Sequence, residues 1–201
     1  GGSAIRPVSR ESVNDPRLLS AILLKERISI WSSVPSLWLR LLSYIEKQAE
    51  MGRLPAFPDL RLIQLGGEAL GSGPVRRWQA HYADHIRFVN LYGPTEATIS
   101  ATCYFLPARL KTLDNRIPIG QALPGRVLRV VDEKDQMCKP GVKGELLIGG
   151  IGLSPGYLHD NKLSEKRFVT VDGKRFFRTG DLVFVQPNGS LVFVGRNDTQ
   201  V

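Results

Sequence analysis

The stretch NLYGPTE at residues 90–96 decides how this 201-residue sequence folds. The apolar run at residues 86–91 predicts a buried strand, and the Gly-Pro pair predicts that the strand ends in a turn. Tyr92, Thr95 and Glu96 are then expected at the carboxyl edge of a sheet, where open α/β folds bind ligands. An aromatic ring, a hydroxyl and a carboxylate can stack on a base, bind a phosphate oxygen and hold a magnesium ion. The alternative is an ordinary strand exit in which the Thr and Glu begin a helix.

The sequence before this stretch alternates between helix and strand patterns. Three segments, two of them opened by Pro16 and Pro35, carry apolar residues at helical spacing. Short apolar runs at residues 28–31 and 60–65 are typical of strands. This alternation predicts a parallel sheet covered by helices, an α/β fold, for residues 1–122.

The pattern changes near residue 122. Short strand-like runs, several of them separated by Gly or Pro, then follow at residues 127–131, 145–148, 167–171, 174–178, 182–185 and 191–194. The last two runs flank Gln-Pro-Asn-Gly, which is typical of a hairpin turn. We therefore expect a smaller antiparallel, β-rich subdomain at residues 123–194. Residues 195–201 look like the start of a further motif.

Two further glycine-containing motifs are candidates for ligand contacts. Gly66 and Gly67 follow a strand and permit close approach of a flat ligand, but they equally permit a tight turn. Asp181 lies in Arg-Thr-Gly-Asp-Leu between two strand-like runs, and a carboxylate fixed by a glycine turn can accept bonds from both hydroxyls of a ribose. The alternative for Asp181, favoured without further context, is a turn in which it caps its own backbone.

A glycine-dense segment spans residues 144–157. It has the flexibility of a phosphate-binding loop, but no Lys-Ser/Thr pair closes it, as a P-loop requires. Its glycines are therefore expected to be structural.

Charge and cysteine content exclude several classes of protein. The chain carries 27 basic and 19 acidic side chains, a net charge of +8, but no basic run is longer than two residues. This even spread argues against a nucleic-acid partner.

No apolar stretch approaches the roughly 18 residues of a membrane span, which argues against a membrane protein. Cys103 and Cys138 lack metal-site or redox spacing, so free thiols in a reducing cytoplasm are expected.

Taken in order, the motifs resemble the adenylate-forming, AMP-binding enzymes, and most closely the amino-acid adenylation domains of nonribosomal peptide synthetases. Residues 90–96, 144–158, 178–182 and 195–201 match four successive signatures of that family. The departures are small: Phe177 stands where the family has tyrosine, and Ser-Pro precedes Gly156 where it has Ala-Arg. The resemblance implies the core of the large N-terminal subdomain of such an enzyme.

The resemblance also assigns expected roles to individual residues. Thr95 would contact phosphate and Glu96 would hold Mg²⁺. The remaining nucleotide contacts would come from Gly66 and Gly67 beside the purine, Tyr92 stacked on adenine, Asp181 on the ribose hydroxyls, Arg196 nearby and Phe193 against the nucleoside. The substrate pocket would map onto Ser33, Gln64, Gly66, Leu91, Ile99 and Ser100, and Asp198 would be the hinge to a C-terminal lid. Each pocket residue could equally be core packing.

The implied reaction uses ATP to activate an amino acid as an aminoacyl-adenylate. The acyl group then passes to the phosphopantetheine thiol of a peptidyl carrier protein, with neighbouring synthetase domains as further partners. The family's phosphate loop and lid lysine are expected before residue 1 and after residue 201, so we expect the chain alone to be inactive. The alternatives are an acyl- or aryl-CoA ligase of the same superfamily, a non-catalytic binding module and a degenerate segment kept as a scaffold.

Overall fold

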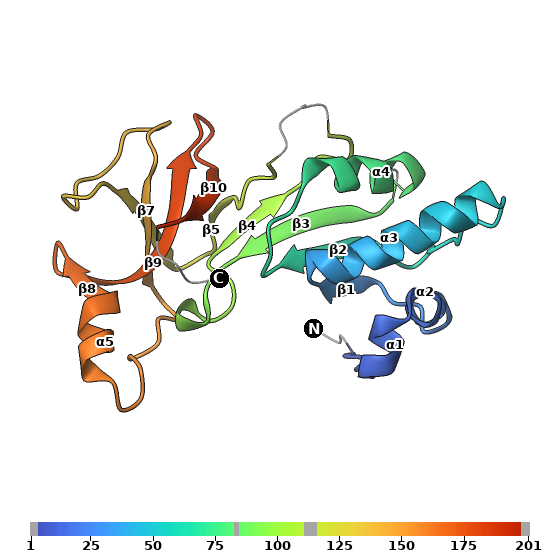
Figure 1. Cartoon of the computed structure of the whole chain (residues 1–201), viewed down its shortest axis with the longest axis horizontal. Helices are drawn as coiled ribbons and strands as arrows, with labels where there is room; N and C mark the ends of the chain where they lie inside the picture. Colours follow the sequence, from blue (N-terminus) through green and yellow to red (C-terminus); the bar gives the residue numbers. More distant parts are fainter. Residues whose placement is uncertain (1–3, 83–84, 111–115, 198–201) are drawn as a thin grey trace. The chain divides into compact units, whose positions relative to one another are not determined.

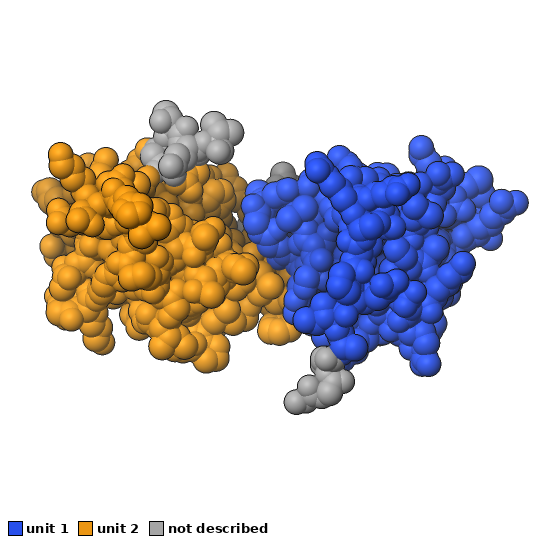
Figure 2. All heavy atoms as spheres, turned by 90° about the horizontal axis from the view of Figure 1, so that it is seen from below, with its two compact units in different colours: residues 1–88, 106–113 blue, residues 89–105, 114–201 orange. Residues whose placement is uncertain are grey.

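Residues 4–82, 85–110 and 116–197 are described by a computed structural model, and the contacts of the chain divide it into two units (Figure 1, Figure 2). The first unit consists of residues 1–88 and 106–113, and the second consists of residues 89–105 and 114–201. The chain passes from one unit to the other inside strand β3 (Arg87–Tyr92). Each unit is described below by itself.

The first unit is an α/β unit with a parallel strand pair. Its elements are α1 (Arg10–Asn14), α2 (Pro16–Lys25), β1 (Ile30–Ser33), α3 (Pro35–Glu50), β2 (Leu62–Gly66) and α4 (Ser72–Tyr82) (Figure 1). Strands β1 and β2 pair in parallel, with Ile30 opposite Leu62 and Ser33 opposite Leu65. The strand–helix alternation predicted from the sequence is confirmed, although β1 begins two residues later than the predicted run.

Helices α2 and α3 begin where the sequence signals predict, whereas α1, which is capped by the Ser9 hydroxyl, was not predicted. Asp15 caps α2 by accepting a hydrogen bond from the backbone N–H of Arg17 at 2.8 Å, and Pro16 occupies the first helical position. Helix α3 also has a proline, Pro35, at its start, but the preceding Val34 provides no side-chain cap. Both helices therefore start at residues whose local chemistry satisfies or removes free backbone N–H groups.

Aromatic side chains form the core of the first unit. Trp38 of α3 and Trp78 of α4 are fully buried, and their rings lie 5.9 Å apart between centroids. Phe88 meets both rings edge to face, at 5.4 Å and 5.9 Å. The apolar face of each helix, with its 3.6-residue spacing, is therefore buried against one aromatic cluster.

The second unit opens with a small antiparallel group of strands. Strand β3 pairs with β4 (Thr102–Phe105), and β4 pairs with β5 (Gln121–Ala122). A one-turn 3₁₀ helix, η1 (Thr95–Ala97), separates β3 from β4. The sequence analysis expected only parallel strands before residue 122, and it did not identify β4. A four-residue strand of mixed burial lacks the apolar run that marks a buried strand.

A second sheet follows, and all of its pairs are antiparallel. It contains β6 (Arg126–Val131), β7 (Gly144–Gly150), β8 (Phe168–Val171), β9 (Lys174–Val185) and β10 (Leu191–Arg196), with α5 (Asn161–Arg167) before β8 (Figure 1). The strand order is β10-β9-β7-β6, and β8 pairs with β9. The predicted antiparallel character and the β9–β10 hairpin are confirmed. Strand β5 is the last strand of one sheet and β6 is the first strand of the other along the chain. The expected subdomain limits at residues 122 and 194 stay predictions.

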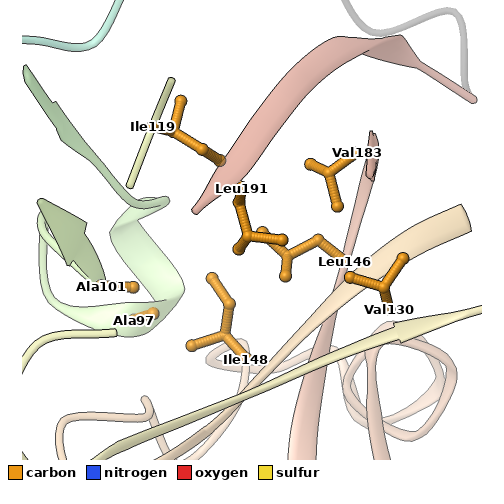
Figure 3. Close-up of a cluster of buried hydrophobic side chains, with 8 residues drawn as sticks. All are labelled: Ala97, Ala101, Ile119, Val130, Leu146, Ile148, Val183 and Leu191. Atoms are coloured by element: carbon orange, nitrogen blue, oxygen red, sulfur yellow. The ribbon is translucent and has the colours of Figure 1, made fainter. Parts of the chain in front are cut away.

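The core of the second unit joins this sheet to the segment that follows β3. Its buried members are Ala97, Ala101, Ile119, Val130, Leu146, Ile148, Val183 and Leu191 (Figure 3). Leu147, between two of these residues on β7, points to the other face and packs with Val131 and Phe176. This alternation follows from the two-residue period of a strand. Because Ala97 and Ala101 are completely buried in the core, the turn after β3 is held against the sheet.

Candidate active site

The turn at the end of β3 carries three of the predicted site residues. Tyr92 is the last residue of β3, and Thr95 and Glu96 begin η1. Gly93 permits the turn, because a Cβ atom there would lie 2.6 Å from the backbone nitrogen of Ala101. The backbone N–H of Ala101 also donates to the carbonyl oxygen of Tyr92 at 2.8 Å. The helix that starts at Thr95 is a single 3₁₀ turn, which keeps Thr95 and Glu96 close to the strand end.

Arg126 of β6 stabilises this turn. Its Nη2 donates to the carbonyl oxygen of Ala97 at 2.7 Å and to that of Ser100 at 3.2 Å. Its Nη1 donates to the carbonyl oxygen of Ile151. One guanidinium therefore satisfies carbonyl groups of two loops. The sequence analysis missed this residue, because an arginine at the start of a strand carries no local signal for such contacts.

The glycine-dense segment contacts the same turn. The Thr98 hydroxyl donates to the carbonyl oxygen of Gly152 at 2.6 Å, and the backbone N–H of Ser154 donates to the carbonyl oxygen of Glu96 at 2.8 Å. These contacts join the glycine-dense segment to the turn after β3, and the structural role of its glycines stays a prediction.

Tyr157, at the end of the glycine-dense segment, contacts the Glu96 side chain. Its hydroxyl donates to Glu96 Oε1 at 2.5 Å. Burial, and then this hydrogen bond, raise the pKa of Tyr157 to about 12. The tyrosine therefore stays a neutral donor, and it orients the carboxylate that the sequence analysis selected as the metal ligand. Tyr157 is the last residue of the glycine-dense segment, and the sequence alone indicated no role for it.

Asp181 of β9 is buried, with 6% of its surface exposed. Its Oδ2 accepts a hydrogen bond from the Tyr92 hydroxyl, and its Oδ1 accepts one from Nη1 of Arg196 at 2.8 Å. Arg196 of β10 is its cross-strand partner in the β9–β10 hairpin. Burial, and then the Asp181 carboxylate, raise the pKa of Tyr92 well above its usual value. Three predicted nucleotide-binding residues are thus brought together.

The backbone around Asp181 differs from the prediction. The sequence analysis placed it in a turn between two strands, but β9 runs unbroken from Lys174 to Val185. Gly180 has a φ of +73°, and the register with β7 shifts there, so that residues 179–181 face the single residue Leu146. A glycine that interrupts a strand pattern can therefore mark a bulge within one strand as well as a turn between two. The backbone N–H of Asp181 donates to the Thr179 hydroxyl at 2.9 Å, and its carboxylate contacts the side chains of Tyr92 and Arg196.

The remaining candidates for nucleotide contact are Phe193, Gly66 and Gly67. Phe193 of β10 is half-buried, faces Val183 in the register, and packs against the core of the second unit together with Tyr92. Gly66 ends β2 in the first unit, and Gly67 follows it with a φ of +83°. The next residue, Glu68, accepts hydrogen bonds from the backbone N–H and the hydroxyl of Ser36 at 2.8 Å, so it caps α3.

The expected pocket residues fall in both units. Ser33 and Gln64 lie on the parallel pair of the first unit, and Gln64 accepts a hydrogen bond from the Ser32 hydroxyl at 2.6 Å. Leu91 lies on β3 in the second unit, and Ser100 follows Ile99, whose φ is +65° and whose surface is 79% exposed. The expected hinge, Asp198, lies outside the described residues.

The predicted metal site rests on Glu96 alone. Among the residues that the structure describes, no group of three or more His, Cys, Asp or Glu side chains is placed to hold a metal ion. Mg²⁺ is commonly bound by one or two carboxylates together with substrate phosphates. A single carboxylate that Tyr157 orients is therefore compatible with a magnesium site completed by the nucleotide.

Within the described ranges, no helix has the length and apolar character needed to cross a membrane.

A comparison with known families decides which protein class carries this arrangement. The family model described as AMP-binding enzyme matches residues 1–158. The chain belongs to the AMP-binding enzyme family. The match includes the NLYGPTE turn and the glycine-dense segment. It confirms the adenylate-forming family that the order of the motifs indicated.

Relatives of this AMP-binding enzyme include peptide synthases and a carrier-protein ligase. A linear gramicidin synthase polypeptide of Brevibacillus parabrevis is 38% identical over 206 residues, which cover 100% of this chain and 2% of that polypeptide. The D-alanine--D-alanyl carrier protein ligase of Bacillus licheniformis is 30% identical over 200 residues, covering 100% of this chain and 38% of the ligase. The chain therefore spans well under half the length of these relatives.

A solved structure confirms the fold. PA1221, described as a nonribosomal peptide synthetase protein containing adenylation and PCP domains, superposes with a TM-score of 0.79 at 29% identity. The match covers 92% of this chain and 37% of PA1221. The mixed α/β architecture followed by an antiparallel sheet is thus that of the adenylate-forming enzymes.

Proposed function

We propose that this chain forms part of a cytoplasmic enzyme that activates an amino acid with ATP and loads it onto a carrier protein. The substrate carboxylate attacks the α-phosphorus of ATP, and pyrophosphate leaves with the electrons of the broken P–O bond. The thiol of a carrier-bound phosphopantetheine then attacks the acyl carbon, and AMP leaves. A carboxylate is already a nucleophile at neutral pH, so the protein's task is positioning and charge stabilisation.

The observation that carries the proposal is the arrangement of Tyr92, Asp181 and Arg196. A carboxylate has about four lone-pair sites, enough to accept from two ribose hydroxyls in addition to the phenol and the guanidinium described above. Those two donors also hold the carboxylate rigidly for that contact. We assign Asp181 to the ribose, the Tyr92 ring to adenine and Arg196 to the orientation of Asp181.

The other assignments rest on the resemblance of the motifs to the family. Glu96, oriented by Tyr157, would hold Mg²⁺, and the Thr95 hydroxyl beside it would bind phosphate. Magnesium supplies partial neutralisation of the phosphate charge when it is bound. Gly66 and Gly67 are assigned to the purine, and Phe193 to the nucleoside.

The pocket and hinge assignments rest on the family resemblance, and the partner assignment rests on the relatives. The pocket for the amino-acid side chain would be lined by Ser33, Gln64, Gly66, Leu91, Ile99 and Ser100, and Asp198 would be the hinge. A carrier-protein partner is supported by the ligase that names a carrier protein and by the PCP domain of PA1221. Because the chain spans less than half of these relatives, we expect no adenylation by the chain alone.

The proposal is tested by amino-acid-dependent exchange of pyrophosphate into ATP. A longer polypeptide containing this chain, of the length of the carrier-protein ligase, should exchange with one or a few amino acids. The Asp181→Asn variant should raise the KM for ATP about tenfold to hundredfold, because a bond to a charged acceptor is lost. Asp172→Asn, at an exposed carboxylate paired with Arg129, is the matched control and should leave the KM unchanged. Equal KM values for all three proteins would contradict the ribose assignment.

The acyl acceptor needs a separate assay. The same polypeptide, supplied with a phosphopantetheinylated carrier protein or with free coenzyme A, should acylate the carrier thiol. Acylation of coenzyme A alone would identify an acyl- or aryl-CoA ligase, and acylation of neither would contradict the transfer step.

A further inference from the structure

We propose that Glu145 of β7 is a positioning residue that sets the ribose selectivity of the nucleotide site by fixing the bulge next to Asp181. The inference rests on the proposed function, because it assumes that Asp181 contacts the ribose. Glu145 itself touches neither Tyr92 nor Arg196 in the contacts described above. It acts on the backbone that carries the carboxylate.

The two carboxylate oxygens of Glu145 contact two different points of β9. Oε2 accepts a hydrogen bond from Nη1 of Arg178 at 2.7 Å, and Oε1 accepts one from the backbone N–H of Gly180 at 3.1 Å. Only 18% of the Glu145 side chain is exposed, so water competes weakly for either contact. One side chain therefore connects the residue before the bulge to the residue at its centre.

The bulge needs an acceptor from outside the backbone ladder. On β7, Glu145 is in register with Leu182, and Leu147 is in register with Arg178, so the three residues between them on β9 have a single residue opposite. A backbone N–H left without an acceptor in a buried position is costly. The Glu145 carboxylate replaces the missing ladder carbonyl at Gly180, whose φ of +73° directs its N–H away from the regular pattern.

Other groups of the bulge are also held by hydrogen bonds. The position of Asp181 therefore depends on the backbone conformation of Gly180. The Thr179 hydroxyl donates to the carbonyl oxygen of Leu146 at 2.7 Å, and the backbone N–H of Asn197 donates to the carbonyl oxygen of Gly180 at 2.7 Å. With Glu145 in place, both polar backbone groups of Gly180 have partners. Loss of the carboxylate would leave a buried donor at the residue that precedes Asp181.

A second carboxylate provides a matched control. Asp135, with 51% of its side chain exposed, accepts a hydrogen bond from Nη2 of Arg178. It shares the same guanidinium as Glu145 but makes no contact with Gly180. Replacing Asp135 therefore removes an ion pair of Arg178 and leaves the acceptor of the bulge intact.

The test measures binding of AMP, 2′-deoxy-AMP and 2′,3′-dideoxy-AMP to the 201-residue chain by NMR titration. The unaltered chain should prefer AMP to the dideoxy nucleotide by about tenfold or more, because two hydroxyl contacts to a charged acceptor are lost. Glu145→Leu, which removes both acceptor oxygens and therefore the acceptor of the Gly180 N–H, should reduce that preference to about threefold or less. Its affinity for dideoxy-AMP should stay within about twofold. Asp135→Asn should keep the full preference.

The outcomes separate the two proposals. If the unaltered chain binds no AMP, or binds AMP and dideoxy-AMP equally, the assignment of Asp181 to the ribose fails. If the unaltered chain discriminates and Glu145→Leu discriminates equally, only the role of Glu145 fails. An equal loss of affinity for all three nucleotides would show a merely structural role and would also overturn the inference.

Two measurements protect the test against a variant that does not fold. Glu145→Asp keeps the charge but is one methylene too short to reach both donors, and it should show a reduced preference like that of Glu145→Leu. In the unaltered chain, the Gly180 amide should exchange its hydrogen slowly, since it is buried and bonded. Rapid exchange of that amide would overturn the inference without any variant.

Discussion

Tyr92 and Asp181 are joined by a hydrogen bond although 89 residues separate them along the chain. The phenol stands at the end of β3 and the carboxylate stands at a bulge in β9. The bond is made in the second unit, and both Tyr92 and Phe193 pack against the core of that unit. The contact joins a buried carboxylate to a phenol that stays protonated. Its loss should therefore lower the free energy of unfolding by a measurable amount.

The first prediction concerns this bond and its dependence on pH. Tyr92→Phe should lower the free energy of unfolding by about 1.5–3 kcal/mol at pH 7, because a hydrogen bond to a charged acceptor is lost. The folded pKa of Tyr92 is raised above the usual value of 10.0, so the folded state holds the proton more tightly than the unfolded state does. The contribution is therefore complete below pH 10 and falls as the pH rises above it.

The measurement is urea denaturation of the chain and of the variant between pH 7 and pH 11.5. The difference in free energy between the two proteins should be constant below about pH 10 and should shrink above that value. A difference that grows with rising pH would have the wrong sign and would contradict the assignment of the proton to Tyr92.

Gly93 should not tolerate a side chain. A Cβ atom would lie 2.6 Å from the Ala101 nitrogen and 2.8 Å from the Ile99 carbonyl oxygen, both of which are backbone atoms. Gly93→Ala should therefore lower the free energy of unfolding by about 1–3 kcal/mol through forced movement of the turn. Gly73→Ala, inside α4 with no atom within 4 Å of the added Cβ, is the control and should be neutral or stabilising by up to about 1 kcal/mol. Equal effects of the two substitutions in thermal unfolding would contradict the close approach.

Arg126 should contribute to stability through the hydrogen bonds that its guanidinium donates. Arg126→Met keeps most of the apolar stem but leaves the carbonyl oxygens of Ala97, Ser100 and Ile151 without this donor. We expect a loss of about 2 kcal/mol in the free energy of unfolding, measured in urea. The same change at the exposed Arg53 should stay within about 0.5 kcal/mol. An Arg126→Met protein as stable as Arg53→Met would exclude the bridging role.

The core of the second unit offers a matched pair of isoleucines. Ile148 of β7 is fully buried in the cluster of Figure 3, whereas Ile151, three residues later, is 68% exposed. Ile148→Ala should cost about 2–5 kcal/mol, because the cavity adds to the lost transfer energy. Ile151→Ala should stay near the small effects typical of surface positions. Similar costs in denaturant unfolding would mean that the sheet packs differently from the structure described.

Several features followed from the sequence because their causes are local. Pro16, Asp15 and Pro35 set helix starts through capping and fixed φ angles, and the Pro187-Asn188-Gly189 turn predicted the final hairpin. The alternation of strands and helices gave the α/β class, and the order of four short motifs gave the enzyme family. Each of these signals lies either in a short stretch of neighbouring residues or in the order of such stretches along the chain.

Other features depended on contacts between distant segments, which no local pattern records. Strand β4, the single course of β9 through Gly180 and the contact of Tyr157 with Glu96 all required the folded chain. The sequence marked Tyr92, Glu96 and Asp181 as chemically capable groups, because a residue type states what its atoms can bind. Only the tertiary structure paired Tyr92 and Arg196 with Asp181 and gave Gly180 an acceptor in Glu145, because strand register decides which side chains meet.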